Sequence, residues 1–233
     1  MLRFVQSWMV VLFGTVLATS YGQSSIKARP TDFPSFTVFP GAADSDGLPT
    51  SGAKLCLLKP AGVCFQMPSH RASDSVEYEF GLDPRSEILS LPGGGSLVFF
   101  SSQFSGGGSG TLDRLAILRY QVDGKIINLM PFVGVTNQSD RAVWHIASIS
   151  NFPILMTADF YWRDGETHFS EHYYTVTAYE FDTKRGRYVK AFSYETSKRY
   201  PGLDRVDQVH VLNSERAQIL RRLETGLDEH KAR

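Results

Sequence analysis

Residues 112–129 read LDRLAILRYQVDGKIINL, and this stretch decides the fold class. Two runs rich in apolar residues, 112–122 and 125–129, flank the pair Asp123-Gly124. Asp-Gly between two apolar runs is a strong short-range signal for a hairpin turn, because the turn needs positive φ angles that these residues tolerate. The stretch therefore predicts two antiparallel β-strands joined by a tight turn.

A second hairpin is predicted further along the chain. Residues 172–181 and 187–196 form two strand-like runs, and the turn-forming sequence DTKRG separates them at 182–186. Side chains alternate between the two faces of a strand. We therefore expect Tyr188, Phe192 and Tyr194 to share one face with Lys190.

The remainder of the chain is a series of short strand-like runs divided by turn residues. Further runs cover 76–80, 87–91, 96–104, 142–149 and 154–162. Helical spacing occurs only near the end, where Asn213 is a candidate cap for a helix over 214–225 and Gly226 a candidate stop. We expect a mainly β fold: a single antiparallel β-sandwich or partly closed sheet with one short C-terminal helix. A small β-propeller is the alternative, although we find no internal repeat to support it.

The N-terminal segment, residues 1–22, has the layout of a secretory signal peptide. Arg3 gives a positive start, the apolar run 9–18 follows, and small residues precede a polar stretch. The run is shorter than the ~20 apolar residues that span a membrane; a retained signal-anchor is the alternative. We expect a secreted or periplasmic protein without stable membrane anchoring, with an extended arm at 23–51, a β-rich domain at 52–226 and a charged tail at 227–233.

The chain has two cysteines, Cys56 and Cys64. In an oxidising compartment two nearby cysteines favour a disulfide. The Pro-Ala-Gly sequence at 60–62 is typical of a tight turn, which would place the two cysteines opposite each other. Closing so short a loop stabilises the fold by about 2–3 kcal/mol in the chain-entropy model. A nucleophilic Cys64 is the alternative.

Composition argues against some classes of partner. The chain has 24 basic and 24 acidic residues and 42% hydrophobic residues. A neutral chain has no general attraction for nucleic acid or anionic membrane. The glycine-rich stretch 105–111 lacks the lysine of a phosphate-binding loop, and the residues after it favour a strand rather than a helix. We expect no nucleic-acid partner and no cofactor, and the sequence carries no signal for an oligomeric state.

The densest cluster of polar side chains lies in residues 159–172, DFYWRDGETHFSEH. It follows an apolar run, so we expect a loop carried by rigid strands, where binding sites often lie. Aromatic rings with polar groups beside them are favoured at interfaces. The candidate binding residues are Trp162, Asp164, Glu166, His168 and His172. Core packing is the alternative role for the aromatic residues of this region.

The same loop has residue types that suit two other kinds of site. His168 and His172 are four positions apart, which suits metal ligands on a helix but not on a strand, and we therefore expect no metal site. A hydrolase would use Asp159 with Glu166, or Glu166 with Glu171, at a carboxyl separation of about 5 Å or about 6.5–9.5 Å. Such a pair would raise at least one carboxyl pKa.

We therefore expect an exported, non-enzymatic binding or interaction protein. Its partner would be a protein or a cell-envelope polymer, and the loop between Trp162 and His172 would make the contact. The alternative is an extracytoplasmic hydrolase that uses the carboxylates of the same loop.

Overall fold

The hairpin around Asp123-Gly124 is present, and it belongs to a central five-stranded antiparallel sheet. In the computed structural model β8 (Thr111–Tyr120) pairs with β9 (Ile126–Asn128), and Gly124 has φ 86°. The other strands of this inner sheet are β6 (Leu82–Ser90), β7 (Ser96–Ser105) and β10 (Gly134–Asn137). The structure describes residues 31–71, 77–105, 111–130, 134–137, 140–160, 162–167, 170–201 and 210–231.

The outer sheet covers one face of the inner sheet. It consists of β1 (Phe36–Phe39), β2 (Lys54–Leu57) and β3 (Cys64–Gln66) in that order. Apolar side chains from both sheets meet in one buried cluster, which includes Leu55, Phe100 and Leu118. Burial of these side chains stabilises the packing of one sheet on the other.

The helix-covered sheet lies on the opposite face of the inner sheet. Its strands are, in order, β11 (Asp140–Trp144), β12 (Ile154–Phe160), β14 (Tyr174–Asp182) and β15 (Arg187–Glu195). A second buried cluster fills the space between these two sheets and includes Phe99, Leu155 and Tyr188. A third cluster lies on the far face of the helix-covered sheet, where α1 (His210–Ser214) and α2 (Arg216–Lys231) pack.

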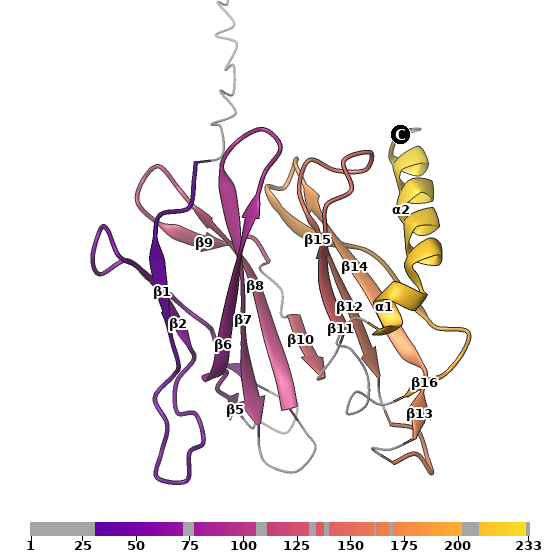
Figure 1. Cartoon of the computed structure of the whole chain (residues 1–233), viewed down its shortest axis with the longest axis horizontal. Coiled ribbons are helices and arrows are strands. Elements are labelled where there is room, and N and C mark those ends of the chain that lie inside the picture. Colours follow the sequence, from indigo (N-terminus) through magenta and orange to yellow (C-terminus); the bar gives the residue numbers. More distant parts are fainter. Residues whose placement is uncertain are drawn as a thin grey trace, which may run out of the picture.

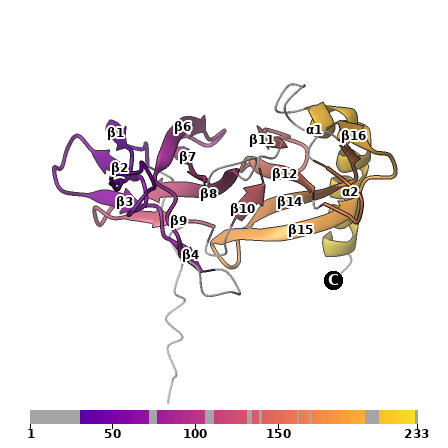
Figure 2. The ribbon, with the colours of Figure 1, turned by 90° about the horizontal axis from the view of Figure 1, so that it is seen from below.

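The molecule is therefore a stack of layers: outer sheet, inner sheet, helix-covered sheet and helices (Figure 1). Figure 2 shows the same order from a perpendicular direction. Two short strand pairs complete the described structure, β4 (His70–Arg71) with β5 (Glu77–Tyr78) and β13 (Glu171–His172) with β16 (Tyr200–Pro201). The expected mainly β, antiparallel, sandwich-like fold with a short C-terminal helix is confirmed.

A buried ion pair joins the inner sheet to the helix-covered sheet. Arg141 of β11 donates a hydrogen bond to Oδ2 of Asp113 in β8. The side chain of Asp113 is only 3% exposed and that of Arg141 only 13%. Burial raises the pKa of the Asp113 carboxyl, and Arg141 opposes that effect. The pair adds a charged contact to the apolar cluster that joins the two sheets.

The boundaries of the helical segment differ from the prediction. Asn213 lies inside α1 rather than capping a helix, and Gly226 lies inside α2 rather than ending it. Helix begins earlier because Val211 and Leu212 bury themselves against the helix-covered sheet. The break between the helices falls at Glu215, a buried carboxylate that accepts hydrogen bonds from the hydroxyls of Tyr194 and Tyr200.

The predicted alternation along residues 187–196 is wrong. β14 and β15 pair Ala178 with Phe192 but Tyr179 with Lys190, so Ala191 is an extra residue in a β-bulge. After the bulge, each side chain of β15 therefore points to the face opposite to the one that simple alternation predicts. Tyr188 consequently packs between the two sheets, whereas Phe192 and Tyr194 pack on the helix side.

The strand predicted over 142–149 is shorter than expected. β11 ends at Trp144, and a turn occupies residues 147–149, where the amide of Ile149 donates to the carbonyl of Ile146. His145 is therefore an exposed residue after the strand, while the Trp144 side chain is buried among the residues that contact the helices.

The predicted disulfide between Cys56 and Cys64 is present. The two residues face each other across β2 and β3 with a Cα–Cα distance of 4.0 Å. Gly62 has the expected positive φ of 88° in the connecting turn. Among the described residues, no helix has the length and apolar character needed to cross a membrane. The proposed signal peptide, residues 1–22, lies outside the described residues.

Candidate functional site

The loop between β12 and β13 folds back on itself in a tight turn. The amide of Glu166 donates to the carbonyl of Arg163 at 2.9 Å, and the amide of Arg163 donates to Oε2 of Glu166, also at 2.9 Å. Gly165 has φ 79°, a conformation that glycine adopts without strain. Residues 163–166 thus form a closed turn held by both backbone and side chain.

A buried carboxylate–imidazole pair anchors this turn to the body of the protein. Oε2 of Glu166 lies 2.9 Å from Nδ1 of His172, and the two side chains are 6% and 0% exposed. Because an ionised carboxylate only accepts hydrogen bonds, Nδ1 is the donor. The Arg163 amide, and secondly His172, lower the pKa of Glu166 below its ordinary value.

His172 mainly makes packing contacts that hold the local structure together. Its ring stacks on Phe160 with centroids 4.3 Å apart, and β13 pairs it with Tyr200 of β16. Nε2 of His172 has no hydrogen-bond partner among the described residues. Carboxylates orient imidazole bases in this way in hydrolases. Here, however, the ring is fully buried, and within the described chain no hydroxyl or thiol hydrogen bonds to Nε2.

The outer side of the turn carries an aromatic and cationic surface, which we call the Trp162 patch: Trp162, Arg163, Tyr173 and Arg199. The guanidinium carbons of Arg163 and Arg199 lie 4.5 Å and 5.0 Å from the ring centroid of Tyr173. Trp162 is 52% exposed. Arg163 also donates to Oε2 of Glu195 on β15, and Nη1 of Arg199 lies 3.6 Å from Oε1 of Glu166. Stacking and ion pairing therefore hold both arginines in place.

The predicted site residues divide between these two environments. Glu166 and His172 come together in the buried pair, while Trp162 and Asp164 lie at the exposed side of the turn. His168 lies outside the described residues. No group of three or more potential metal ligands occurs among the described residues.

Sequence reasoning assigned Glu195 and Arg199 to no site, and it counted Tyr173 only among the aromatic residues of this region. Tyr173 directly follows His172, but its contact with two guanidinium groups depends on the return of the chain at Arg199. That return is made by the β13–β16 pairing, which joins residues about thirty positions apart. A weak signal was available in the basic pair Lys198-Arg199 beside Tyr200.

Comparison with family models, curated proteins and solved structures finds no match. The functional argument therefore depends on the geometry of the site.

Proposed function

We propose that this is an exported, non-enzymatic binding protein whose partner is another protein and whose contact surface is the Trp162 patch. The observation that carries the proposal is a half-exposed Trp162, adjacent in sequence to Arg163, whose guanidinium group lies with that of Arg199 over the ring of Tyr173. Trp, Tyr and Arg are the residues most enriched among those that dominate binding energy at protein interfaces.

The rigidity of the turn supports this proposal. Binding has to overcome the entropy lost when side chains and loops become ordered, about 0.5–1.5 kcal/mol for each flexible side chain. Here the Arg163 amide, the buried Glu166 and the Arg163–Glu195 ion pair already fix the turn. A fixed turn presents Trp162 at a small entropic cost.

The hydrolase alternative finds less support in the same residues. A general acid needs a raised carboxyl pKa, because burial or a neighbouring negative charge must disfavour ionisation. The pKa of Glu166 is lowered instead. Asp164 and Glu171 are exposed, so neither shares the buried surroundings of Glu166.

Export is part of the proposal. The disulfide and the lack of a membrane-spanning helix in the described chain are compatible with an extracytoplasmic protein. The signal-like segment 1–22 supports the same location.

The test is a pull-down from cell-envelope extract with the chain that begins at residue 23, followed by affinity measurement with each purified partner. Trp162→Ala should weaken the partner's affinity at least about tenfold, as expected for a residue that dominates an interface. Leu58→Ala is a matched control, because Leu58 is 58% exposed on the hairpin of the outer sheet. Both variants should keep the wild-type melting temperature.

Two results would contradict the proposal. Equal affinity of the partner for the wild type and the Trp162→Ala variant would remove the patch from the contact. If the wild type instead binds a purified envelope polysaccharide through Trp162, and no protein is recovered, the partner is a polysaccharide and not a protein.

A further inference from the structure

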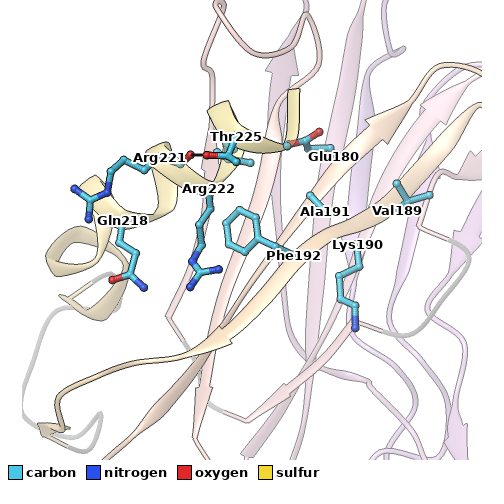
Figure 3. Close-up of a pocket in the computed structure, with 11 residues that line it drawn as sticks. Glu180, Val189, Lys190, Ala191, Phe192, Gln218, Arg221, Arg222 and Thr225 are labelled. Atoms are coloured by element: carbon cyan, nitrogen blue, oxygen red, sulfur yellow. Dashed lines mark hydrogen bonds between the residues drawn. The ribbon is translucent and has the colours of Figure 1, made fainter. Parts of the chain in front are cut away.

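A groove of about 660 Å³ lies between α2 and β15, apart from the Trp162 patch. Figure 3 shows that its lining side chains come from the helix on one side and from β15, with Glu180 of β14, on the other. The volume lies within the ~300–1,000 Å³ typical of ligand pockets. Val189, Ala191, Phe192 and Leu223 give the groove apolar surface, and most of its other lining residues are polar or charged.

The groove carries more positive than negative charge. Its lining contains three cations, Lys190, Arg221 and Arg222, and a single acid, Glu180. Lys190 shares the strand face of Tyr188, so the two arginines are the cations on the helix side of the sheet. In the part of the chain that the structure describes, none of these cations is held in an ion pair. Arg222 lies over the ring of Tyr194, 4.4 Å from its centroid. The whole chain has no net charge, so this excess of positive charge is a local feature of the groove.

We infer that the groove binds an extended acidic segment of a partner protein, at a site separate from the Trp162 patch. Along α2 the lining runs from Gln218 to Gly226, which corresponds to ~12 Å of helix. An extended peptide covers that length with about four residues. Carboxylates of such a segment would pair with Arg221 and Arg222, and an apolar side chain would contact Phe192.

We expect the acidic segment to be bound by side chains of the groove and not by backbone hydrogen bonds to the edge of β15. β15 is the last strand of its sheet, so its outer edge has backbone groups that could pair with another strand. However, the bulge at Ala191 and the neighbouring Lys190 are features that interrupt and protect such edges. They disfavour a dimer formed by edge-to-edge pairing of two copies of β15.

The test measures fluorescence anisotropy with labelled octapeptides rich in Glu, in Gln or in Lys. The Glu-rich peptide should bind, its affinity should fall as salt is added, and the other two peptides should not bind. The double variant Arg221→Glu/Arg222→Glu should weaken binding of the Glu-rich peptide at least about tenfold. Lys54→Glu is the control for charge, because Lys54 is exposed on the outer sheet.

Four results would overturn the inference. The double variant could bind the Glu-rich peptide with wild-type affinity, or the wild type could bind the Gln-rich peptide equally well. The wild type could instead prefer a polyuronate to the Glu-rich peptide, or sedimentation could show a wild-type dimer that the double variant cannot form. Melting temperatures verify that the variants fold, and the single change Arg221→Gln replaces the double variant if the latter is unfolded. The peptide assay and the pull-down test different surfaces. A negative result with the peptides leaves the proposed role of Trp162 standing, and an unchanged affinity of the Trp162→Ala variant leaves the peptide site standing.

Discussion

At the scale of single residues, Glu166 fixes the candidate binding turn. Its carboxylate accepts a hydrogen bond from the Arg163 amide and another from the imidazole of His172. These interactions favour the ionised form, which is why the pKa of Glu166 is lowered. A carboxyl group with a lowered pKa in the folded state stabilises that state above its ordinary pKa of 4.5. This stabilisation is lost as the pH falls through the folded-state value.

The first prediction concerns Glu166→Gln and the pH dependence of stability. Near neutral pH the variant should be less stable than the wild type, because an amide replaces the ionised acceptor. The difference should shrink as the pH falls below about 4.5, where the unfolded wild-type chain takes up the proton, and should be smallest below the lowered folded-state pKa, where the folded carboxyl is protonated too. Urea unfolding at about pH 6 and about pH 3 measures it. Asp164→Asn, a change on the exposed side of the same turn, serves as the control. A difference that stays constant or grows on acidification would contradict this role of Glu166.

The candidate site could be located from the sequence, but its internal geometry could not. Residues 159–172 were identified because charged and aromatic side chains follow an apolar strand, which is local information. The division into a buried pair and an exposed patch depends on β13 pairing with β16, which is not local. Sequence spacing therefore grouped Glu166 and His172 with Trp162 as contact residues, whereas the structure buries the first two.

At the scale of elements, the bulge in β15 decides which aromatic side chains face the helices. Tyr188 packs between the sheets, whereas Phe192 and Tyr194 face the helices, because Ala191 adds one residue to the strand. A strand without a bulge would place all three on one face. No local signal marks Ala191, since the bulge arises from the register with β14.

The second prediction follows from that register. Deleting Ala191 should restore a continuous ladder and keep each aromatic side chain on its present face. Deleting Ser193 in the same strand should move Phe192 or Tyr194 away from the helices. We expect the Ser193 deletion to be less stable by about 2 kcal/mol or more, given the cost of removing large buried side chains. Chemical unfolding of both variants measures this, and equal stabilities would show that the bulge does not set the faces.

The hairpins were predictable for a different reason from the helices. Gly124 and Gly186 both have positive φ in their turns, so the local sequence carried the signal. The helix boundaries were wrong because the buried stripe that continues into α2 begins with a charged residue at the break between the helices. Glu215, Ile219 and Leu223 are spaced at four-residue intervals and are all buried. The spacing of apolar residues does not predict that Glu215 is buried, because its burial depends on hydrogen bonds from two Tyr hydroxyls that are distant in the sequence.

At the scale of the whole molecule, the ion pair between Asp113 and Arg141 connects two layers of the stack. Oδ1 of Asp113 has no hydrogen-bond partner among the described residues, so Arg141 is its main source of compensation. Removing one member of a buried pair leaves an uncompensated charge, which usually costs about 3–5 kcal/mol.

The third prediction is that Arg141→Met destabilises the protein by about that amount near neutral pH. Adding Asp113→Asn should restore part of the loss, because no buried charge is then left unpaired. Burial already raises the pKa of Asp113, and loss of Arg141 should raise it further. The cost of Arg141→Met should therefore decrease as the pH falls and Asp113 becomes protonated. Urea unfolding of the single and double variants measures these effects. Equal stability of the two variants would contradict the role of the pair.

The layered arrangement also determines where this sequence can change. β7 and β8 are buried on both faces along most of their length, so neighbouring residues such as Phe99 and Phe100 belong to different cores. A polar substitution there has no solvent-facing position to occupy, whichever face it points to. We therefore expect β7 and β8 to tolerate the fewest substitutions and to change most slowly over generations. Exposed positions such as Arg221 on α2 and Trp162 in its turn carry no such constraint. A new binding preference could thus arise at these positions while the scaffold stays the same.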